Sequence, residues 1–299
     1  LNSSVDCCRP FNLFNWNVCP AQVDALELHQ QATDCQIDFE IIIGDDFSNQ
    51  TIYNSSNLIN SELIKLHRSS ASVGRTEMRR LLSKKAKYNW LLYIDSDMLP
   101  SEKNYIKKYI ENLTKNPHIK AFFGGYSYSK HYPHKERLRF RYGMSREFKS
   151  AKDRKNNPYR NIYSGNMLIY RESFELTNIA LDNRYGLDLA FSRELECQNI
   201  AFKHLDNYTN HMGIEDNSTF LLKSKEASKT IRHLYDQNLI SSRHSKLVWT
   251  YKFIEKLHLT KVIELKGRLL NPLMSWMLIN FKSPLITLDF YKFYHFCKK

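Results

Sequence analysis

The chain has 299 residues, 42% of them hydrophobic, with nine glycines, eight prolines and a formal net charge of +13. This composition excludes collagen-like and largely disordered proteins, and it allows one large domain or one domain with an appendage. The longest apolar block, at 273–281, is shorter than the roughly 20 residues of a membrane-spanning helix, so we expect no span.

The cysteines are scattered and form no C-x-x-C pair, which argues against a zinc site or a disulfide scaffold. This usage fits a reducing compartment. No basic segment followed by an apolar run opens the chain, so we expect no signal peptide and a cytoplasmic protein. The cysteines are Cys7, Cys8, Cys19, Cys35, Cys197 and Cys297.

The first clear element is a buried strand at 39–43, with the sequence Phe-Glu-Ile-Ile-Ile. Upstream, we expect a short strand at 3–8, a loop at 10–17 and a loose helix at 23–32. Asp45 and Asp46 follow the strand, where carboxylates can hydrogen-bond a ribose or a base. Turn chemistry explains the same residues, and it is favoured when they are taken alone.

A basic helix follows a short predicted strand at 63–66. Apolar residues recur at helical spacing from Met78 to Ala86, with arginines and lysines between them. Arg75 lies where this helix begins and could meet a phosphate or a base. A solvated surface arginine is the alternative.

An apolar run at 90–94 predicts a buried strand that ends in Asp95-Ser96-Asp97. Residues two apart on an extended segment point to the same side, so the two carboxylates can converge just past the strand end. Such a pair suits a hard divalent cation such as Mg²⁺ or Mn²⁺. Taken alone, a polar strand exit with two solvated aspartates explains the motif equally well.

A helix at 105–113 follows, with Ser101 as its expected N-cap. A further strand is predicted at 121–126, where the paired glycines Gly124 and Gly125 allow a ligand or another backbone to approach closely.

Ser164, Gly165 and Asn166 form a turn into another strand that ends in Arg171. A helix is then predicted at 187–200, and Asp188 lies in its first turn, where the helix dipole favours a carboxylate, so capping is its alternative role. This alternation of strands and helices predicts an α/β domain with a largely parallel sheet.

Two zones carry the positive charge. Residues 130–160 contain eleven Lys or Arg and three Asp or Glu, which predicts a basic surface loop. This loop could be solvated, or it could face a phosphate or an acceptor. Residues 216–299 contain fifteen Lys or Arg and six Asp or Glu, and this segment predicts basic amphipathic helices. These helices could pack on the α/β core or lie against an anionic membrane. No recognised nucleic-acid-binding motif accompanies the charge, so we expect no nucleic-acid partner.

Several motifs occur in a fixed order along the chain, and together they resemble the family 2 glycosyltransferases of the GT-A (Rossmann-like) fold. The similarity covers roughly residues 36–220 and is greatest to bacterial members that build surface polysaccharide or lipopolysaccharide. It implies a GT-A domain at 1–220 and a basic helical C-terminal extension at 221–299. The motifs are Phe39 to Ser48, Gly74-Arg75 before a helix with Arg79, Asp95-Ser96-Asp97, Gly165-Asn166 before Arg171, Tyr185 to Asp188, and His211 to Asn217.

The resemblance implies a role for each matching residue. Asp188 would be the general base. Asp45, Asp46, Arg75 and Asp95 would contact the nucleotide. Asp95, Asp97 and His211 would form the metal shell. Gly125, Gly165 and Asn166 would lie at the donor sugar or the acceptor.

The implied activity is metal-dependent, inverting transfer of a sugar from a UDP- or GDP-linked donor to a glycan or lipid-linked acceptor, with Mn²⁺ or Mg²⁺. An alternative is a degenerate relative that binds nucleotide or glycan without turnover, because Leu187 stands where the family has a glutamate. A phosphohydrolase with Asp95 as nucleophile is a third hypothesis, although such chemistry usually uses the first strand of the sheet.

Overall fold

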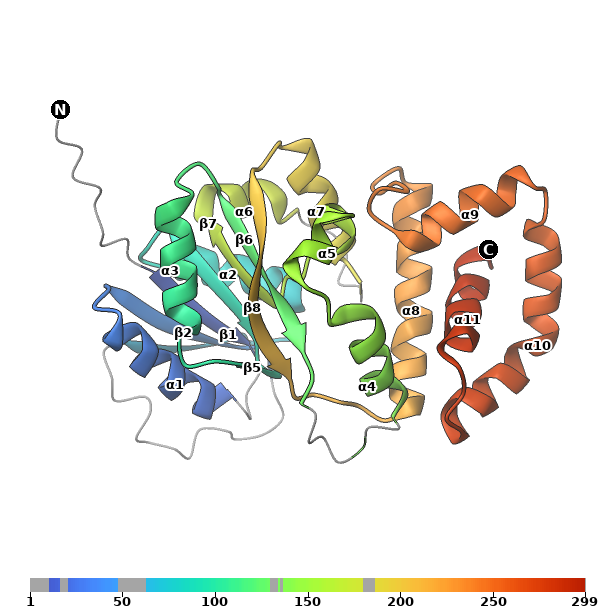
Figure 1. Ribbon diagram of the computed structural model, residues 1–299, viewed down its shortest axis with the longest axis horizontal. Helices are drawn as coiled ribbons and strands as arrows, with labels where there is room; N and C mark the ends of the chain where they lie inside the picture. The colour runs from blue at the N-terminus through green and yellow to red at the C-terminus, as the bar shows by residue number, and fades with distance from the viewer. Residues whose placement is uncertain are drawn as a thin grey trace.

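The structure is a computed structural model that describes residues 11–16, 21–47, 63–129, 134, 137–179 and 186–298. Figure 1 shows a twisted β-sheet between two layers of helices, with a further group of helices beyond one edge of the sheet. The helices of this C-terminal group are α8 (Asn217–Asp236), α9 (Lys246–Lys256), α10 (Thr260–Asn280) and α11 (Leu285–Cys297).

The described sheet has eight strands in the order β3-β2-β1-β4-β7-β6-β8-β5. Only β5 and β7 run against the other strands, so four neighbouring pairs are parallel and three antiparallel. The predicted α/β fold is confirmed, with a mixed sheet. The strands are β1 (Phe11–Trp16), β2 (Phe39–Asp45), β3 (Ile64–Arg68), β4 (Trp90–Asp95), β5 (Met98–Pro100), β6 (Ala121–Ser127), β7 (Asn166–Tyr170) and β8 (Phe202–His211).

Strand β4 shows why both faces of the sheet are covered. Successive side chains of a strand point to opposite faces. Leu92 and Ile94 join a core with α1 (Ala21–Asp34) and α3 (Tyr105–Lys115). Leu91 and Tyr93 join a second core on the other face. The helices of that second core are α2 (Arg75–Lys85), α6 (Arg171–Thr177) and α7 (Asp188–Cys197).

The predicted loop at 10–17 is wrong, because 11–16 forms β1, which pairs in parallel with β2 and β4. Its asparagines disfavour a strand, but backbone pairing on both sides outweighs that weak local preference. The predicted strand at 3–8 lies outside the described residues. Strands β5 and β8 were not predicted.

The predicted cap of α3 is also wrong. Asn104 occupies the N-cap position, and the Oγ atom of Ser101 lies 2.9 Å from that of Ser127 instead.

The basic zone at 130–160 is not a simple solvated excursion in the part that the structure describes. It contains α4 (Leu138–Tyr142), a π-helical turn at Gly143–Glu147 and α5 (Ala151–Lys155). Arg139 and Arg154 are buried, and Arg154 donates hydrogen bonds to the carbonyls of Gly124 and Leu205.

The C-terminal helices pack on the α/β domain through Leu187, at the start of α7. Leu187 is buried with Leu234 of α8, Val248 of α9 and Phe296 of α11. The predicted C-terminal helical extension is therefore present. None of the described helices combines the length and apolar character needed to cross a bilayer.

Candidate functional site

Polar side chains gather where β4 ends and where α2 and α7 begin. Asp95 is the last residue of β4, Arg75 the first of α2 and Asp188 the first of α7. The carboxyl ends of parallel strands are where open α/β sheets bind ligands. The fold thus brings together three residues that are far apart in the sequence.

Arg75 bridges two carboxylates in this site. Its Nη2 atom lies 2.6 Å from both carboxylate oxygens of Asp188, and its Nη1 atom lies 3.3 Å from Oδ2 of Asp95. Burial works to lower the pKa of Arg75, but the two carboxylates outweigh it and raise that pKa. Arg75 is therefore a fixed positive charge between Asp95 and Asp188.

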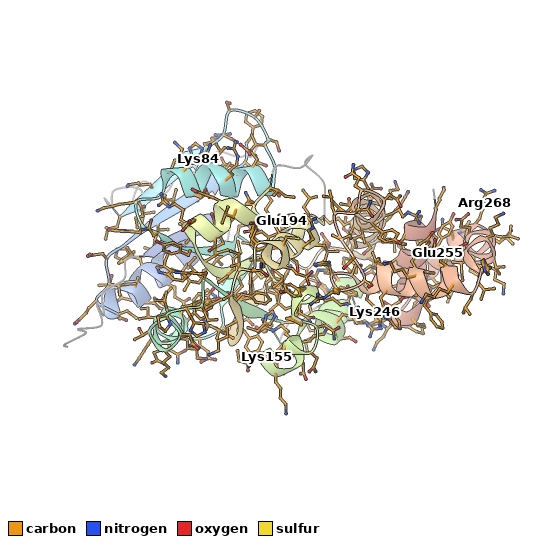
Figure 2. The ribbon with its side chains drawn as sticks, turned by 90° about the horizontal axis from the view of Figure 1, so that it is seen from above. Lys84, Lys155, Glu194, Lys246, Glu255 and Arg268 are labelled. Atoms are coloured by element: carbon orange, nitrogen blue, oxygen red, sulfur yellow. The ribbon has the colours of Figure 1, made fainter. Side chains whose placement is uncertain are left out.

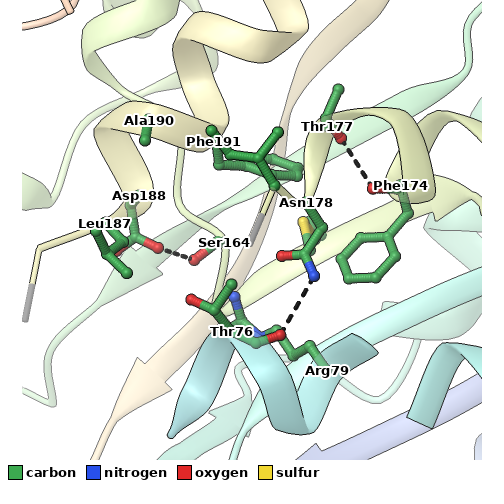
Figure 3. Close-up of a pocket in the computed structure, with 12 residues that line it drawn as sticks. Thr76, Arg79, Ser164, Phe174, Thr177, Asn178, Leu187, Asp188, Ala190 and Phe191 are labelled. Carbon is green, nitrogen blue, oxygen red and sulfur yellow. Dashed lines mark hydrogen bonds between the residues drawn. The ribbon is translucent and has the colours of Figure 1, made fainter. Parts of the chain in front are cut away.

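Asp188 is held ionised. Burial works to raise its pKa, but the charges of Arg75 and Arg79 and a hydrogen bond from Ser164 lower it. The Ser164 hydroxyl donates to Oδ1 of Asp188 at 2.5 Å. Figure 3 shows Asp188 and Ser164 in contact at one side of a small pocket, which Arg79, Leu187 and Phe191 also line.

Asp95 is fixed by a second arginine that was not assigned a role from the sequence. The Nη2 atom of Arg79 donates to Oδ1 of Asp95 at 2.6 Å. Both oxygens of Asp95 therefore face guanidinium groups. The helical spacing from Arg75 to Arg79 was the available signal, because residues four apart lie on the same side of a helix.

Asp97 and His211 form a neighbouring pair. Oδ2 of Asp97 lies 3.5 Å from Nε2 of His211. Burial raises the pKa of Asp97 to about 6 and lowers that of His211 to about 4, so His211 is neutral at pH 7. The His211 ring stacks on Tyr128, whose hydroxyl bonds to Glu147.

The Asp97–His211 pair fits a divalent cation, although the described residues contain no group of three His, Cys, Asp or Glu placed to bind one. A carboxylate oxygen and a neutral imidazole nitrogen are both suitable ligands. Nδ1 of His211 is buried without a partner. Mg²⁺ commonly takes one or two protein ligands and completes its shell with substrate phosphates and water.

Asp45 and Asp46 have different surroundings. Asp46 accepts hydrogen bonds from the backbone nitrogens of Val73 and Gly74, at 2.6 and 2.9 Å, and so fixes the loop that leads to Arg75. Asp45 is fully buried and forms an ion pair with Arg68 at 3.3 Å. The predicted nucleotide contact of Asp45 does not fit this geometry, because its carboxylate is enclosed.

The predicted sugar contacts of Asn166 and Gly125 do not fit either. Asn166 is 0% exposed, and its amide is fully used by the hydroxyls of Tyr105 and Tyr109 and the carbonyls of Gly125 and Asn207. Gly125 is buried, and its carbonyl accepts a hydrogen bond from the Asn166 amide.

Gly165 does lie at the site. A Cβ atom on Gly165 would come within 2.4 Å of Oδ2 of Asp95, so only glycine permits this close approach. Tyr185, part of the sequence motif that ends in Asp188, lies outside the described residues.

A family model described as "Glycosyl transferase family 2" matches residues 25–177, which is more than half of the chain. The chain belongs to glycosyl transferase family 2. This match covers β2, the whole of α2 and the Asp95–Asp97 motif, and it ends before Asp188 and His211. The family places the chain among the glycosyltransferases and confirms the family predicted from the sequence motifs.

Two solved structures illustrate the fold of this family 2 glycosyltransferase. Glucosyl-3-phosphoglycerate synthase from Mycobacterium tuberculosis, solved with Mn²⁺, UDP-glucose and phosphoglyceric acid, is similar at a TM-score of 0.51 and 12% identity, over 78% of this chain and 80% of that one. A mannosyltransferase from Pyrobaculum calidifontis, solved with GDP-mannose and Mn²⁺, is similar at a TM-score of 0.51 and 12% identity, over 75% of this chain and 64% of that one. No curated protein sequence matches this chain.

Proposed function

We propose that this chain is a metal-dependent, inverting glycosyltransferase that moves a sugar from a nucleoside diphosphate to a hydroxyl of a glycan or lipid-linked acceptor. The bridge that Arg75 makes between Asp95 and Asp188 carries the proposal. This bridge connects the ionised carboxylate of Asp188 to the end of β4, where the Asp95–Asp97 motif lies.

Asp188 would act as the general base. As the acceptor hydroxyl attacks the anomeric carbon, its proton passes to a carboxylate oxygen, the bond to the diphosphate breaks and the anomeric configuration inverts. The lowered pKa of Asp188 keeps that oxygen unprotonated at neutral pH. No covalent intermediate on the protein is needed.

Arg75 must shift for Asp188 to serve as a base, because Nη2 of Arg75 lies against both oxygens of that carboxylate. A donor diphosphate carries more negative charge than one carboxylate, so it would draw the guanidinium toward itself. Arg79 would stay on Asp95 and preserve the strand end. Donor binding would thereby free the base.

Asp97 and His211 would hold the divalent ion. When bound there, Mn²⁺ or Mg²⁺ would offset the charge that develops on the diphosphate as it leaves. The two similar structures were solved with Mn²⁺ and either UDP-glucose or GDP-mannose, which supports UDP- and GDP-sugars as the first donors to test.

The acceptor we propose is a growing surface glycan such as lipopolysaccharide, in keeping with the bacterial enzymes that the motifs resemble. Leu187 is part of the apolar contact with the C-terminal helices, so this position offers no carboxylate to an acceptor. The cytoplasmic location stays a prediction.

A screen of UDP- and GDP-sugars with Mn²⁺, Mg²⁺ or a chelator, read as thermal stabilisation and then as transfer, tests the function. We expect stabilisation by at least one donor only with metal, and turnover that Asp188→Asn removes. The second candidate is a binding protein without turnover, which the apolar Leu187 and the covered Asp188 favour. It predicts metal-dependent stabilisation with no transfer or hydrolysis of any donor.

A further inference from the structure

Helix α10 has two apolar faces, and only one of them is buried. Its inner face contains Gly267, Met274 and Leu278. Its outer face is a stripe at steps of three or four residues, which places its members on one side of the helix on each side of the bend that Figure 1 shows and that Pro272 explains. The stripe consists of Val262, Leu265, Leu269, Leu273 and Trp276, whose exposure ranges from 43% to 71%. We call these five residues the α10 outer stripe.

The inner face already provides the packing that the fold requires. A Cβ atom on Gly267 would come within 2.2 Å of the Tyr294 ring, so α10 and α11 are in close contact there. Figure 1 shows α11 between α8 and α10, with α10 at the end of the molecule farthest from the sheet. The outer stripe therefore faces away from the rest of the protein.

Other exposed apolar residues adjoin the two ends of α10. Leu257 and Leu259, at the turn from α9, are 50% and 41% exposed. Phe281, just beyond the other end, is 53% exposed. Its ring packs edge-on against the stripe residue Trp276, with 4.7 Å between the ring centroids. Apolar surface gathered in this way marks an interaction site rather than scattered surface residues.

Positive charge surrounds this surface. Residues 246–282 contain seven Lys or Arg and only two Asp or Glu. On a helix with 100° per residue, Lys266 falls on one side of the outer stripe, and Lys261 and Arg268 fall on the other. All three are exposed. Figure 2 shows Arg268 projecting from the outer end of the molecule.

We propose that the α10 outer stripe lies in the surface of an anionic membrane. Exposed leucines and tryptophan flanked by lysine and arginine have the chemistry of an interfacial helix, in which apolar side chains enter the acyl boundary and cations meet lipid phosphates. A second copy of the chain fits less well, because a two-fold contact would bring the same cations together.

Vesicle co-sedimentation of the full chain tests this surface without any need for turnover. The probes are vesicles of phosphatidylcholine alone and vesicles with about 30% phosphatidylglycerol, at about 0.1 and 0.5 M NaCl. We expect binding to the anionic vesicles that weakens at high salt. The triple variant Leu265→Glu, Leu269→Glu, Leu273→Glu should bind more than about tenfold more weakly, because three apolar side chains lose their burial in the membrane.

The matched control is Leu26→Glu on α1, at the opposite end of the molecule, where the leucine is 55% exposed. It should bind vesicles like the wild type. Circular dichroism and the melting temperature verify that the triple variant is folded, and its nucleotide binding should be unchanged, which separates this proposal from the proposed function.

Three results would overturn the proposal. They are equal vesicle binding by the wild type and the triple variant, equal binding to neutral and anionic vesicles, and no vesicle binding by a wild type that sedimentation velocity shows to be a dimer when the triple variant is a monomer.

Discussion

Nη2 of Arg75 lies 2.6 Å from both carboxylate oxygens of Asp188, while Nη1 reaches Asp95. One guanidinium therefore joins the first residue of α7 to the last residue of β4. This arrangement holds the proposed base ionised and also covers it. It connects the proposed donor side and acceptor side of the site through a single side chain.

Asp188→Asn should lower the turnover number by at least about 100-fold, because an amide cannot accept the proton of the acceptor hydroxyl. Donor affinity should change little, since the proposed metal ligands Asp97 and His211 are untouched. Steady-state transfer and donor titration measure the two effects. Asp34→Asn, in an exposed position on α1, is the control and should keep full activity. Undiminished transfer by Asp188→Asn would exclude its role as the base.

Asp188 should also stabilise the folded protein in a pH-dependent way. Its folded pKa is lower than the ordinary value of 3.8, so its contribution is present above that pH and is lost as the pH falls through the folded pKa. The difference in unfolding free energy between the wild type and Asp188→Asn should therefore be constant above about pH 5 and shrink as the pH falls below about 4. Urea unfolding at a series of pH values measures it, and a difference that stays constant over the whole series would contradict the ion pair with Arg75.

Arg79→Met should destabilise the protein by about 2–3 kcal/mol, because it removes the 2.6 Å partner of a mostly buried carboxylate on Asp95. The matched control on the same helix is Arg80→Met, whose side chain is 38% exposed and pairs with Glu77. Exposed pairs contribute about 0–1 kcal/mol, so this control should cost no more than that. Equal losses in urea unfolding would show that Asp95 does not depend on Arg79.

Asn166→Ala should reduce the free energy of unfolding by about 2–4 kcal/mol, because it removes the buried amide that accepts from the hydroxyls of Tyr105 and Tyr109 and donates to the carbonyls of Gly125 and Asn207. Its affinity for a donor sugar should stay within about threefold of the wild type, since the side chain is enclosed. If Asn166→Ala were stable but bound the donor much more weakly, the sugar contact predicted for Asn166 from the sequence would be supported.

The strand at β4 and its acidic end could be predicted because a buried strand needs a continuous apolar run, and Trp90 to Ile94 provides one. Strand β1 could not, because its place in the sheet depends on pairing with β2 and β4 rather than on its own residues. Local sequence carries little information about such long-range pairing.

The site was predictable in its parts but not in its connections. The sequence predicts Asp95, Asp97 and Asp188 as candidate site carboxylates, whereas the contact of Arg79 with Asp95 depends on how α2 packs against β4. Leu187 has a similar explanation. It departs from the family's glutamate, and the structure shows it buried with Leu234, Val248 and Phe296, which lie more than 40 residues later in the chain.

Isothermal titration of UDP-glucose and GDP-mannose into the protein, with Mn²⁺ and then with a chelator, tests the central claim most directly. We expect saturable binding of at least one donor in the presence of Mn²⁺, weakened about tenfold or more when the metal is removed, because the proposed function has the donor diphosphate held through the ion. No binding of either donor, or equal affinity with and without metal, would contradict a metal-dependent glycosyltransferase.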